Sequence, residues 1–140
     1  ISQLKKVNNQ AWEDINRLLP QLSGATDYTL EELKETVGQK NLVFLVATDA
    51  LHIIGMALLF FHRQSSGLVA TIEDVVVDAP HQGKGVGKLL MEKLIAIAKK
   101  KGAVYIDLTS RPERKAASGL YKKFGFQKRD TNVYRFIIAK

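Results

Sequence analysis

Hydrophobic residues along this chain follow two periods, one typical of strands and one typical of helices. Apolar or alternating runs predict strands at 42–48, 52–62, 68–77 and 104–109, with shorter strands at 4–7, 126–128 and 133–138. Helical spacing predicts helices from residue 8 or 9 to 20, at 30–37, at 85–101 and from 112 to about 124. The order βααβββαβαββ predicts an α/β (α+β) fold in one domain, residues 1–140, with a mixed central sheet and helices on both faces.

Turn and cap residues support several of these boundaries. Thr29 and Glu32 stand three positions apart before an apolar helical stripe, which is the pattern of a capping box. Gly38 follows the same stripe and is expected to stop the helix. Asp49 and Ala50 separate two apolar runs, so we expect a hairpin there.

The segment 71–91, TIEDVVVDAPHQGKGVGKLLM, carries the most specific chemical signal in the chain. It predicts a β-branched strand, a short turn and a glycine-rich loop that leads directly into an amphipathic helix. Gly83, Gly85 and Gly87 alternate with larger residues, so no Cβ shields the backbone there. The first N–H groups of a helix have no intrahelical partner and lie at its positive end. This arrangement favours binding of a phosphate group.

Two common phosphate loops fit these residues poorly. A Walker A loop needs a glycine where Gln82 stands and Ser or Thr where Leu89 stands. A dinucleotide fingerprint read from Gly83 places Lys88 at the third glycine position. Asp107 does lie about twenty residues further on, where a ribose-binding acid is found, but too little chain remains for the further βαβ units of that fold.

The pattern Gln/Arg-x-x-Gly-x-Gly/Ala is satisfied by Gln82, Gly85 and Gly87, and a second motif, ASGLYKKFGF, follows at 117–126. Together these motifs resemble the acetyl-CoA loop and the later A-x-x-L-Y-x-x-x-G-F helix of the GNAT N-acetyltransferases. The resemblance covers roughly residues 53–136. One departure is Arg114, which stands where the family often has an asparagine that contacts pantetheine.

The resemblance implies a GNAT-like sheet and an acetyl-CoA-dependent N-acetyltransferase in which a primary amine attacks directly in a ternary complex. It implies backbone pairing of the pantetheine arm with the strand and pyrophosphate binding by the loop. The acetyl-CoA contacts expected in this way are Val75, Val76, Val77, Gln82, Gly83, Lys84, Gly85, Val86, Gly87, Lys88 and Arg114.

Three further roles follow from the chemistry together with the resemblance. An ammonium must lose a proton before it attacks, and Glu73 is the expected base or water-orienting group, with Asp74 as an acceptor contact. Strand alternation puts these carboxylates on opposite faces unless a bulge intervenes. Tyr121 is the expected acid for the departing thiolate, the alternative being a core tyrosine. Tyr28 is a candidate acceptor contact, although loop aromatics often only pack.

Charge and composition exclude several other classes. Residues 84–140 contain 15 Lys and Arg against 4 acidic residues, which suits a polyanion such as CoA. Nucleic acid is a weaker alternative because no zinc-finger, RNP or helix-turn-helix signature is present. The chain has no cysteine, and its histidines lack metal-ligand spacing, so we expect no metal site. No apolar run has the length of a membrane span, and a cytoplasmic location is the expectation.

The acceptor amine stays open at this stage, whether a small molecule or a protein or peptide amine. Asp27, Glu31, Glu32 and Glu35 near the expected cleft favour a cationic amine, but they can equally form the solvated face of a helix. A sugar phosphate would need a basic site in the N-terminal half, where Lys and Arg are scattered. The resemblance also admits a homodimer. The alternative to an enzyme is a non-catalytic acyl-CoA-binding or regulatory module of the same fold.

Overall fold

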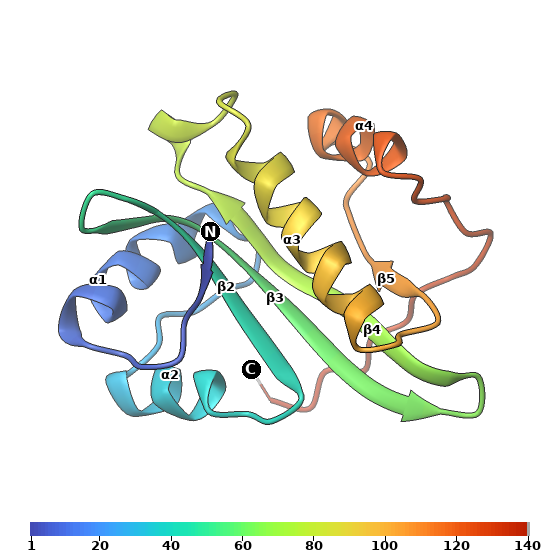
Figure 1. Ribbon diagram of the computed structural model, residues 1–140, viewed down its shortest axis with the longest axis horizontal. Helices are drawn as coiled ribbons and strands as arrows, with labels where there is room; N and C mark the ends of the chain where they lie inside the picture. Colours follow the sequence, from blue (N-terminus) through green and yellow to red (C-terminus); the bar gives the residue numbers. More distant parts are fainter. Residues whose placement is uncertain (140) are drawn as a thin grey trace. The chain divides into compact units, whose positions relative to one another are not determined.

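The computed structural model describes residues 1–139, which fall into two compact units. The first unit, Ile1–Thr109, contains a five-stranded sheet in the order β1-β2-β3-β4-β5 (Figure 1). Neighbouring strands are antiparallel from β1 to β4, whereas β4 and β5 are parallel, so the sheet is mixed. The strands are β1 (Ser2–Gln3), β2 (Leu42–Asp49), β3 (His52–Gln64), β4 (Gly67–Val77) and β5 (Ile106–Leu108).

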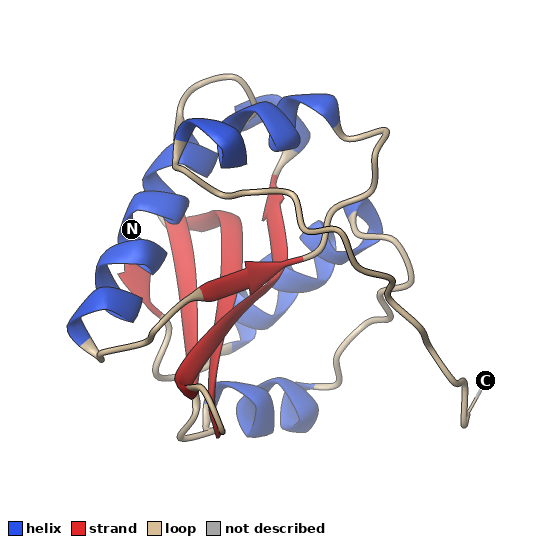
Figure 2. Cartoon of the chain, turned by 90° about the vertical axis from the view of Figure 1, so that its right-hand side faces the viewer, coloured by secondary structure: helices blue, strands red, loops and turns tan. Residues whose placement is uncertain are grey.

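Helices cover both faces of this sheet, as predicted, and Figure 2 shows red strands between blue helices. On one face α1 (Asn9–Leu18) contacts β3 and α2 (Leu30–Val37) contacts β2, and on the other α3 (Val86–Lys100) contacts β2, β3 and β4. Two 3₁₀ turns, η1 (Leu19–Gln21) and η2 (Ala79–His81), complete the first unit. Since β2 lies between helices, six consecutive residues from Leu42 to Ala47 are buried.

The helix starts follow from the cap residues in the sequence. The Asn8 side chain accepts a hydrogen bond from the Ala11 N–H at 2.8 Å and so caps α1. Thr29 and Glu32 form the predicted capping box at α2 with reciprocal hydrogen bonds of 2.8 and 3.1 Å. These bonds satisfy backbone donors that a helix cannot satisfy itself.

A β-bulge interrupts β4 where the two predicted functional carboxylates lie. Met56 of β3 pairs with Val76, and Leu58 pairs with Glu73, so two residues of β4 stand opposite Ala57 alone. Asp74 adopts a left-handed conformation with φ of 52°. Asp tolerates this region better than most residues because its short side chain can bond locally. The bulge therefore breaks the simple alternation of faces along β4.

The second unit begins at Ser110 and contains α4 (Lys115–Lys123). Gly125, with φ of 96°, follows the helix, and the Tyr121 ring packs edge-on against Phe126 with centroids 6.0 Å apart. The predicted strands at 126–128 and 133–138 are wrong for this structure, since no residue from 126 to 139 belongs to a strand. Their β-branched and aromatic residues favour a strand, but a strand forms only when an edge is paired with it.

Three other boundaries differ from the predictions. The first strand lies at Ser2–Gln3 instead of 4–7, because Leu4 and Val7 pack in a loop against the core beneath α1 and α2. The predicted buried strand at 104–109 shortens to the half-buried β5. Helix α4 starts at Lys115, not near Pro112, with Arg114 at its N-cap.

Candidate functional site

The turn that leads from β4 to the glycine-rich loop is fixed by Asp78. The Asp78 N–H donates to Ile54 O at 2.8 Å, and Gln21 Nε2 donates to the carboxylate at 3.1 Å. Arg17 forms an ion pair with the same carboxylate and also donates to Ile53 O at 2.9 Å. Burial raises the pKa of Asp78, but the bonds from Gln21 and Arg17 outweigh it and lower the pKa overall. An ionised Asp78 thus holds the strand end against β3 and α1.

Left-handed glycines shape the loop that follows. Gly83 has φ of 76° and Gly85, the N-cap of α3, has φ of 85°. A Cβ built at either position would meet no atom within 4 Å, so the space in front of the loop is open. Among the described residues no side chain caps α3, and its first-turn amides keep their donors for a ligand. These features fit a phosphate-bearing group at the positive end of α3.

Gly55 of β3 allows the start of α3 to lie close to the sheet. A Cβ at this position would come within 3.3 Å of Val76 O, 3.4 Å of Val86 Cγ1 and 3.5 Å of Leu90 Cδ1. These contacts are tight or in direct van der Waals range, so a side chain would press on β4 and α3 together. The glycine thereby fixes the spacing between the bulged strand and the first turn of α3.

Strand β4 is paired with β5 for only part of its length. The parallel pairing covers Ala70, Thr71 and Ile72, opposite Ile106, Asp107 and Leu108. Beyond Ile72, β4 continues to Val77 with β3 as its one strand partner among the described residues. The other edge of residues 73–77 therefore offers backbone groups to an extended ligand. The loop uses part of this edge itself, because Gln82 Nε2 donates to Val77 O at 2.9 Å.

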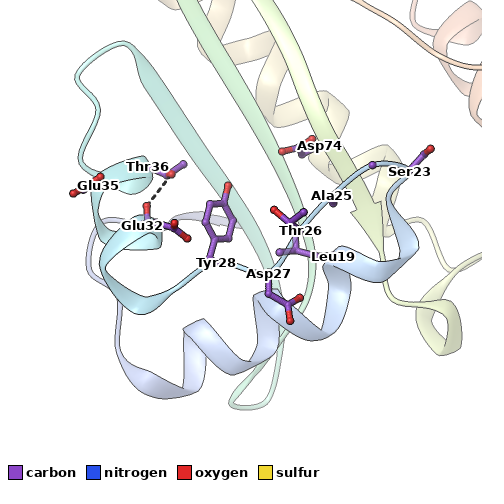
Figure 3. A pocket seen from close by; sticks show the side chains of 11 residues that line it. Leu19, Ser23, Ala25, Thr26, Asp27, Tyr28, Glu32, Glu35, Thr36 and Asp74 are labelled. Carbon is purple, nitrogen blue, oxygen red and sulfur yellow. Dashed lines mark hydrogen bonds between the residues drawn. The ribbon is translucent and has the colours of Figure 1, made fainter. Parts of the chain in front are cut away.

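A pocket of about 530 Å³ lies on the α2 side of the bulge (Figure 3). We call it the acidic pocket. Four carboxylates line it, whereas no Lys or Arg among residues 1–139 does. The lining consists of Leu19, Ser23, Gly24, Ala25, Thr26, Asp27, Tyr28, Glu32, Glu35, Thr36 and Asp74. The structure thus brings together Asp27, Glu32 and Glu35 with Asp74, which is distant from them in sequence.

Tyr28 projects into the acidic pocket from a loop that α1 holds in place (Figure 3). Its carbonyl accepts hydrogen bonds from Trp12 Nε1 at 2.8 Å and Asn16 Nδ2 at 3.0 Å, and its N–H donates to Asn16 Oδ1 at 2.9 Å. Burial raises the pKa of the Tyr28 hydroxyl; a bond with Thr36 lowers it, and the nearby carboxylates raise it. Tyr28 is therefore a neutral hydroxyl on a rigid backbone.

The two adjacent carboxylates of the bulge have different surroundings. Asp74 lines the acidic pocket, and its pKa is raised because partial removal from water disfavours the charged form. Both side chains remain exposed to solvent, but Glu73 does not belong to the pocket lining. The bulge thus places Asp74 on the pocket side.

Tyr121 and Arg114 lie in the second unit, on and at the start of α4. Tyr121 is half-buried beside Phe126. Burial raises the pKa of its hydroxyl, although the charge of Arg114 acts in the opposite direction. Tyr121 is therefore protonated at neutral pH and can donate a hydrogen bond.

Some contributors to the site had no signal in the sequence. Thr36 and the 23–26 loop line the acidic pocket, but their residue types are common in any surface loop. The Gln82 bond to Val77 O joins loop to strand and depends on a backbone geometry that residue types do not reveal.

Metal and membrane sites are not indicated by the described residues. Within residues 1–139 no group of three or more His, Cys, Asp or Glu side chains could hold a metal ion. Over the same range, no helix has both the length and the hydropathy to cross a bilayer.

Comparison with known proteins gives consistent results. Residues 8–126 match the model of the acetyltransferase (GNAT) family. The chain is 35% identical over 122 residues to a probable glucosamine 6-phosphate N-acetyltransferase 2 of Oryza sativa, covering 78% of this chain and 71% of that protein. An acetyltransferase structure from Trypanosoma brucei is 26% identical with a TM-score of 0.78, over 94% of this chain and 96% of that one. The glucosamine-6-phosphate N-acetyltransferase of Arabidopsis thaliana shares the fold, with a TM-score of 0.78 at 23% identity over 98% of both chains.

Proposed function

The chain belongs to the GNAT acetyltransferase family and is an acetyl-CoA-dependent N-acetyltransferase, and from that premise we propose that its acceptor is a cationic amine bound in the acidic pocket. The observation that carries the proposal is the charge of the lining, which includes Asp27, Glu32, Glu35 and Asp74 and, within the described part of the chain, no basic side chain. Polyamines, aminoglycosides and lysine side chains of peptides are amines of this class. Each carries the positive charge that four carboxylates attract.

Acetyl-CoA supplies an acetyl group activated as a thioester, and the residues of β4, the loop and α3 suit it. The amides at the start of α3 and the Lys84 and Lys88 side chains would bind the pyrophosphate, with Gln82, Gly83, Gly85, Val86 and Gly87 forming the loop. The open space before Gly83 and Gly85 supports this assignment. The edge of Val75, Val76 and Val77 beyond the β5 pairing would receive the pantetheine amides. Arg114 would contribute a further phosphate contact.

We assign the removal of the amine proton to residues at the β4 bulge. Asp74 and Tyr28 would hold the ammonium form of the acceptor, and Glu73, which is adjacent to Asp74 but outside the pocket lining, would take its proton through a water molecule. The amine nitrogen then has a lone pair for direct attack in the ternary complex. Backbone N–H groups of Val75 or Val76 would donate to the carbonyl oxygen as negative charge develops on it.

Tyr121 is the proposed donor to the departing thiolate sulfur. Its protonated hydroxyl can give a hydrogen bond even though complete proton transfer from a group with a raised pKa is uphill. Replacing Tyr121 by Phe should lower kcat while the Kd of acetyl-CoA stays unchanged. Tyr134→Phe is the matched control, because Tyr134 is 88% exposed and lies outside the proposed site. Equal kcat in both variants would remove Tyr121 from the mechanism, and absence of turnover with every amine would favour the non-catalytic module.

A sugar phosphate is the second candidate acceptor, because the Oryza relative is named a glucosamine 6-phosphate N-acetyltransferase. Its phosphate would face the carboxylates of the acidic pocket. A pair of unit charges 4 Å apart contributes from about 1 kcal/mol in water to about 4 kcal/mol near a protein surface. The acidic pocket should therefore lower kcat/KM for the phosphorylated amine by about tenfold or more relative to the same amine without the phosphate.

The deciding assay measures kcat/KM for spermidine, kanamycin, glucosamine and glucosamine 6-phosphate at one acetyl-CoA concentration and ionic strength. Glucosamine and its 6-phosphate are the matched pair, since they differ only in the phosphate. We expect the polycations to exceed glucosamine and glucosamine to exceed its phosphate. A double change of Glu32 and Glu35 to Gln should reduce the preference for polycations. A kcat/KM for the phosphate above that for glucosamine would overturn the cationic acceptor and leave the acetyltransferase activity standing.

A further inference from the structure

Helix α1 carries two neighbouring polar side chains that reach two different loops. Asn16 and Arg17 are consecutive, so about 100° separates their directions around the helix axis. Asn16 bonds to the loop that carries Tyr28, and Arg17 bonds to the turn that carries Asp78. The first loop borders the acidic pocket, and the turn leads into the glycine-rich loop. One helix therefore contacts the supports of both proposed substrate sites.

The backbone of Tyr28 is held by side chains of α1. Residues 25–29 have no regular secondary structure. Asn16 Oδ1 accepts from the Tyr28 N–H at 2.9 Å, and Asn16 Nδ2 donates to Tyr28 O at 3.0 Å. Trp12, one helical turn before Asn16, donates to the same oxygen through Nε1 at 2.8 Å. A carboxylate could accept but not donate at position 16, so the amide of Asn16 suits both bonds.

The helix itself does not explain the residue type at position 16. Asn is a weaker helix former than Ala, because its side chain competes for nearby backbone groups. Asn16 nevertheless lies inside α1, and its amide bonds to a residue twelve positions further along the chain. These bonds to Tyr28 are a contribution that alanine could not make.

Arg17 makes a comparable two-point contact on the other side. Its guanidinium pairs with the Asp78 carboxylate through Nη1 and donates to Ile53 O through Nη2 at 2.9 Å. An exposed ion pair alone contributes little, but a planar guanidinium held at two points also orients its partners. The Asp78 carbonyl in turn accepts from the His81 N–H at 2.8 Å within the η2 turn. Gln82 and the glycine-rich loop follow directly.

We propose that Asn16 and Arg17 are positioning residues with separate targets, Asn16 placing Tyr28 for the acceptor amine and Arg17 placing the glycine-rich loop for acetyl-CoA. The inference rests on the proposed function, although the part that concerns Arg17 is independent of which amine is acetylated. Each side chain acts through the residue that it holds and not through contact with a substrate. A hydrogen bond changes an equilibrium by a factor of about 2–10, which sets the size of the expected effects.

The test replaces each residue by alanine in the full chain. Ala is the best helix former, so neither change weakens α1 through propensity. Asn16→Ala removes two bonds and should raise the KM of spermidine about tenfold while the Kd of acetyl-CoA stays unchanged. Arg17→Ala should raise the Kd of acetyl-CoA about two- to tenfold and leave the KM of spermidine unchanged at saturating acetyl-CoA. Glu13→Ala is the matched control, since Glu13 is exposed on the same helix and should change neither constant.

The opposite signatures of two adjacent residues separate positioning from a purely structural role. A helix that merely loses stability would change both constants together in both variants, and that result would overturn the proposal, as would wild-type constants in both. Hydrogen exchange gives a readout without substrates. Asn16→Ala should speed exchange of the Tyr28 amide, and Arg17→Ala that of the Asp78 amide, which donates to Ile54 O. Unaltered exchange of these amides would contradict the contacts on which the proposal stands.

A failure of this inference is distinguishable from a failure of the proposed function. If Asn16→Ala keeps the wild-type KM for spermidine but the double change of Glu32 and Glu35 to Gln raises it, the amine binds in the acidic pocket and Asn16 does not position it. If the double variant also keeps the wild-type KM, the amine binds elsewhere and the proposed function falls together with the role of Asn16. The Kd of acetyl-CoA in Arg17→Ala decides the role of Arg17 in either case.

Discussion

Replacing Gly85 tests the proposed phosphate loop in two ways. Of the substitutions Gly85→Ala and Gly85→Asp, we expect Ala to reduce the stability of the fold more and Asp to reduce the affinity for acetyl-CoA more. Gly85 caps α3 with φ of 85°, and a Cβ there has free space. The cost of Gly85→Ala is therefore mainly the left-handed conformation, about 1–2 kcal/mol for an ordinary residue. In a chain of 140 residues, that corresponds to a fall in Tm of about 3–7 °C.

Gly85→Asp should be less damaging to stability than Gly85→Ala. Asp tolerates the left-handed region better, and a carboxylate at a helix N-terminus gains about 0.3–1 kcal/mol from the helix dipole. The same carboxylate should repel the pyrophosphate of acetyl-CoA. One added unit charge near another contributes about 1–4 kcal/mol, so we expect the Kd to rise by about tenfold or more. Gly85→Ala adds no charge and should change the Kd by much less.

Gly102 supplies the matched control for these substitutions. It has φ of 81° and no atom within 4 Å of a built Cβ, but it follows the C-terminal end of α3. Ala should cost about the same at both positions, whereas the dipole acts against Asp at Gly102. Calorimetry for Tm and isothermal titration for the Kd measure both effects. The reasoning is refuted if Gly85→Asp unfolds below Gly85→Ala, or if it binds acetyl-CoA as tightly as the wild type.

Three further changes test the supports of the site. Burial raises the pKa of Asp14, but hydrogen bonds from Ile53 N and other donors outweigh burial and lower the pKa overall. The ionised carboxylate therefore stabilises the fold above a pH of about 4, and this contribution is lost as the pH falls through the pKa of the folded state. Asp14→Asn should thus cost about 1–3 kcal/mol at pH 7 and clearly less at pH 3 by urea unfolding, and an equal cost at both would contradict the role of the charge. Leu33→Ala should cost about 2–5 kcal/mol, since Leu33 is 0% exposed, and a loss below about 1 kcal/mol would show that the site collapses around the cavity. Gly55→Ala should lower the free energy of unfolding by about 1–3 kcal/mol and weaken acetyl-CoA binding, because the added Cβ presses on Val76 O. An unchanged Kd of acetyl-CoA would show that this contact does not influence the binding loop.

Local patterns predicted those parts of the fold that depend on neighbouring residues. The bounds of α2 follow from its capping box and from Gly38, and they agree with the structure at both ends. The glycines before α3 likewise mark its start within one residue. The β2–β3 hairpin was predictable from the two apolar runs on either side of Asp49 and Ala50. A turn this short can join the two strands only in an antiparallel pair.

Features that depend on distant partners could not be predicted in the same way. The bulge at Asp74 lies inside a β-branched run and exists because Ala57 alone stands opposite two residues of β4. From the sequence, the acidic residues before and within α2 could equally have formed a solvated helix face. Only the structure shows that three of them, Asp27, Glu32 and Glu35, line a pocket together with Asp74. Residues 133–138 have the composition of a strand, but composition alone does not supply the paired edge that a strand needs, and the structure contains no strand there.

If acetyl-CoA binds as proposed, the incomplete pairing of β4 and β5 gives the donor substrate a structural role as well as a chemical one. Where the two strands separate, residues 73–77 keep one edge of β4 open, and an extended ligand laid along that edge acts as an additional strand. A ligand that binds only the folded chain stabilises it, by about 2.7 kcal/mol at one hundred times its Kd. Such a stabilisation lowers the unfolded fraction by about a hundredfold, and with it exposure to proteolysis. The lifetime of this protein should therefore follow the supply of acetyl-CoA.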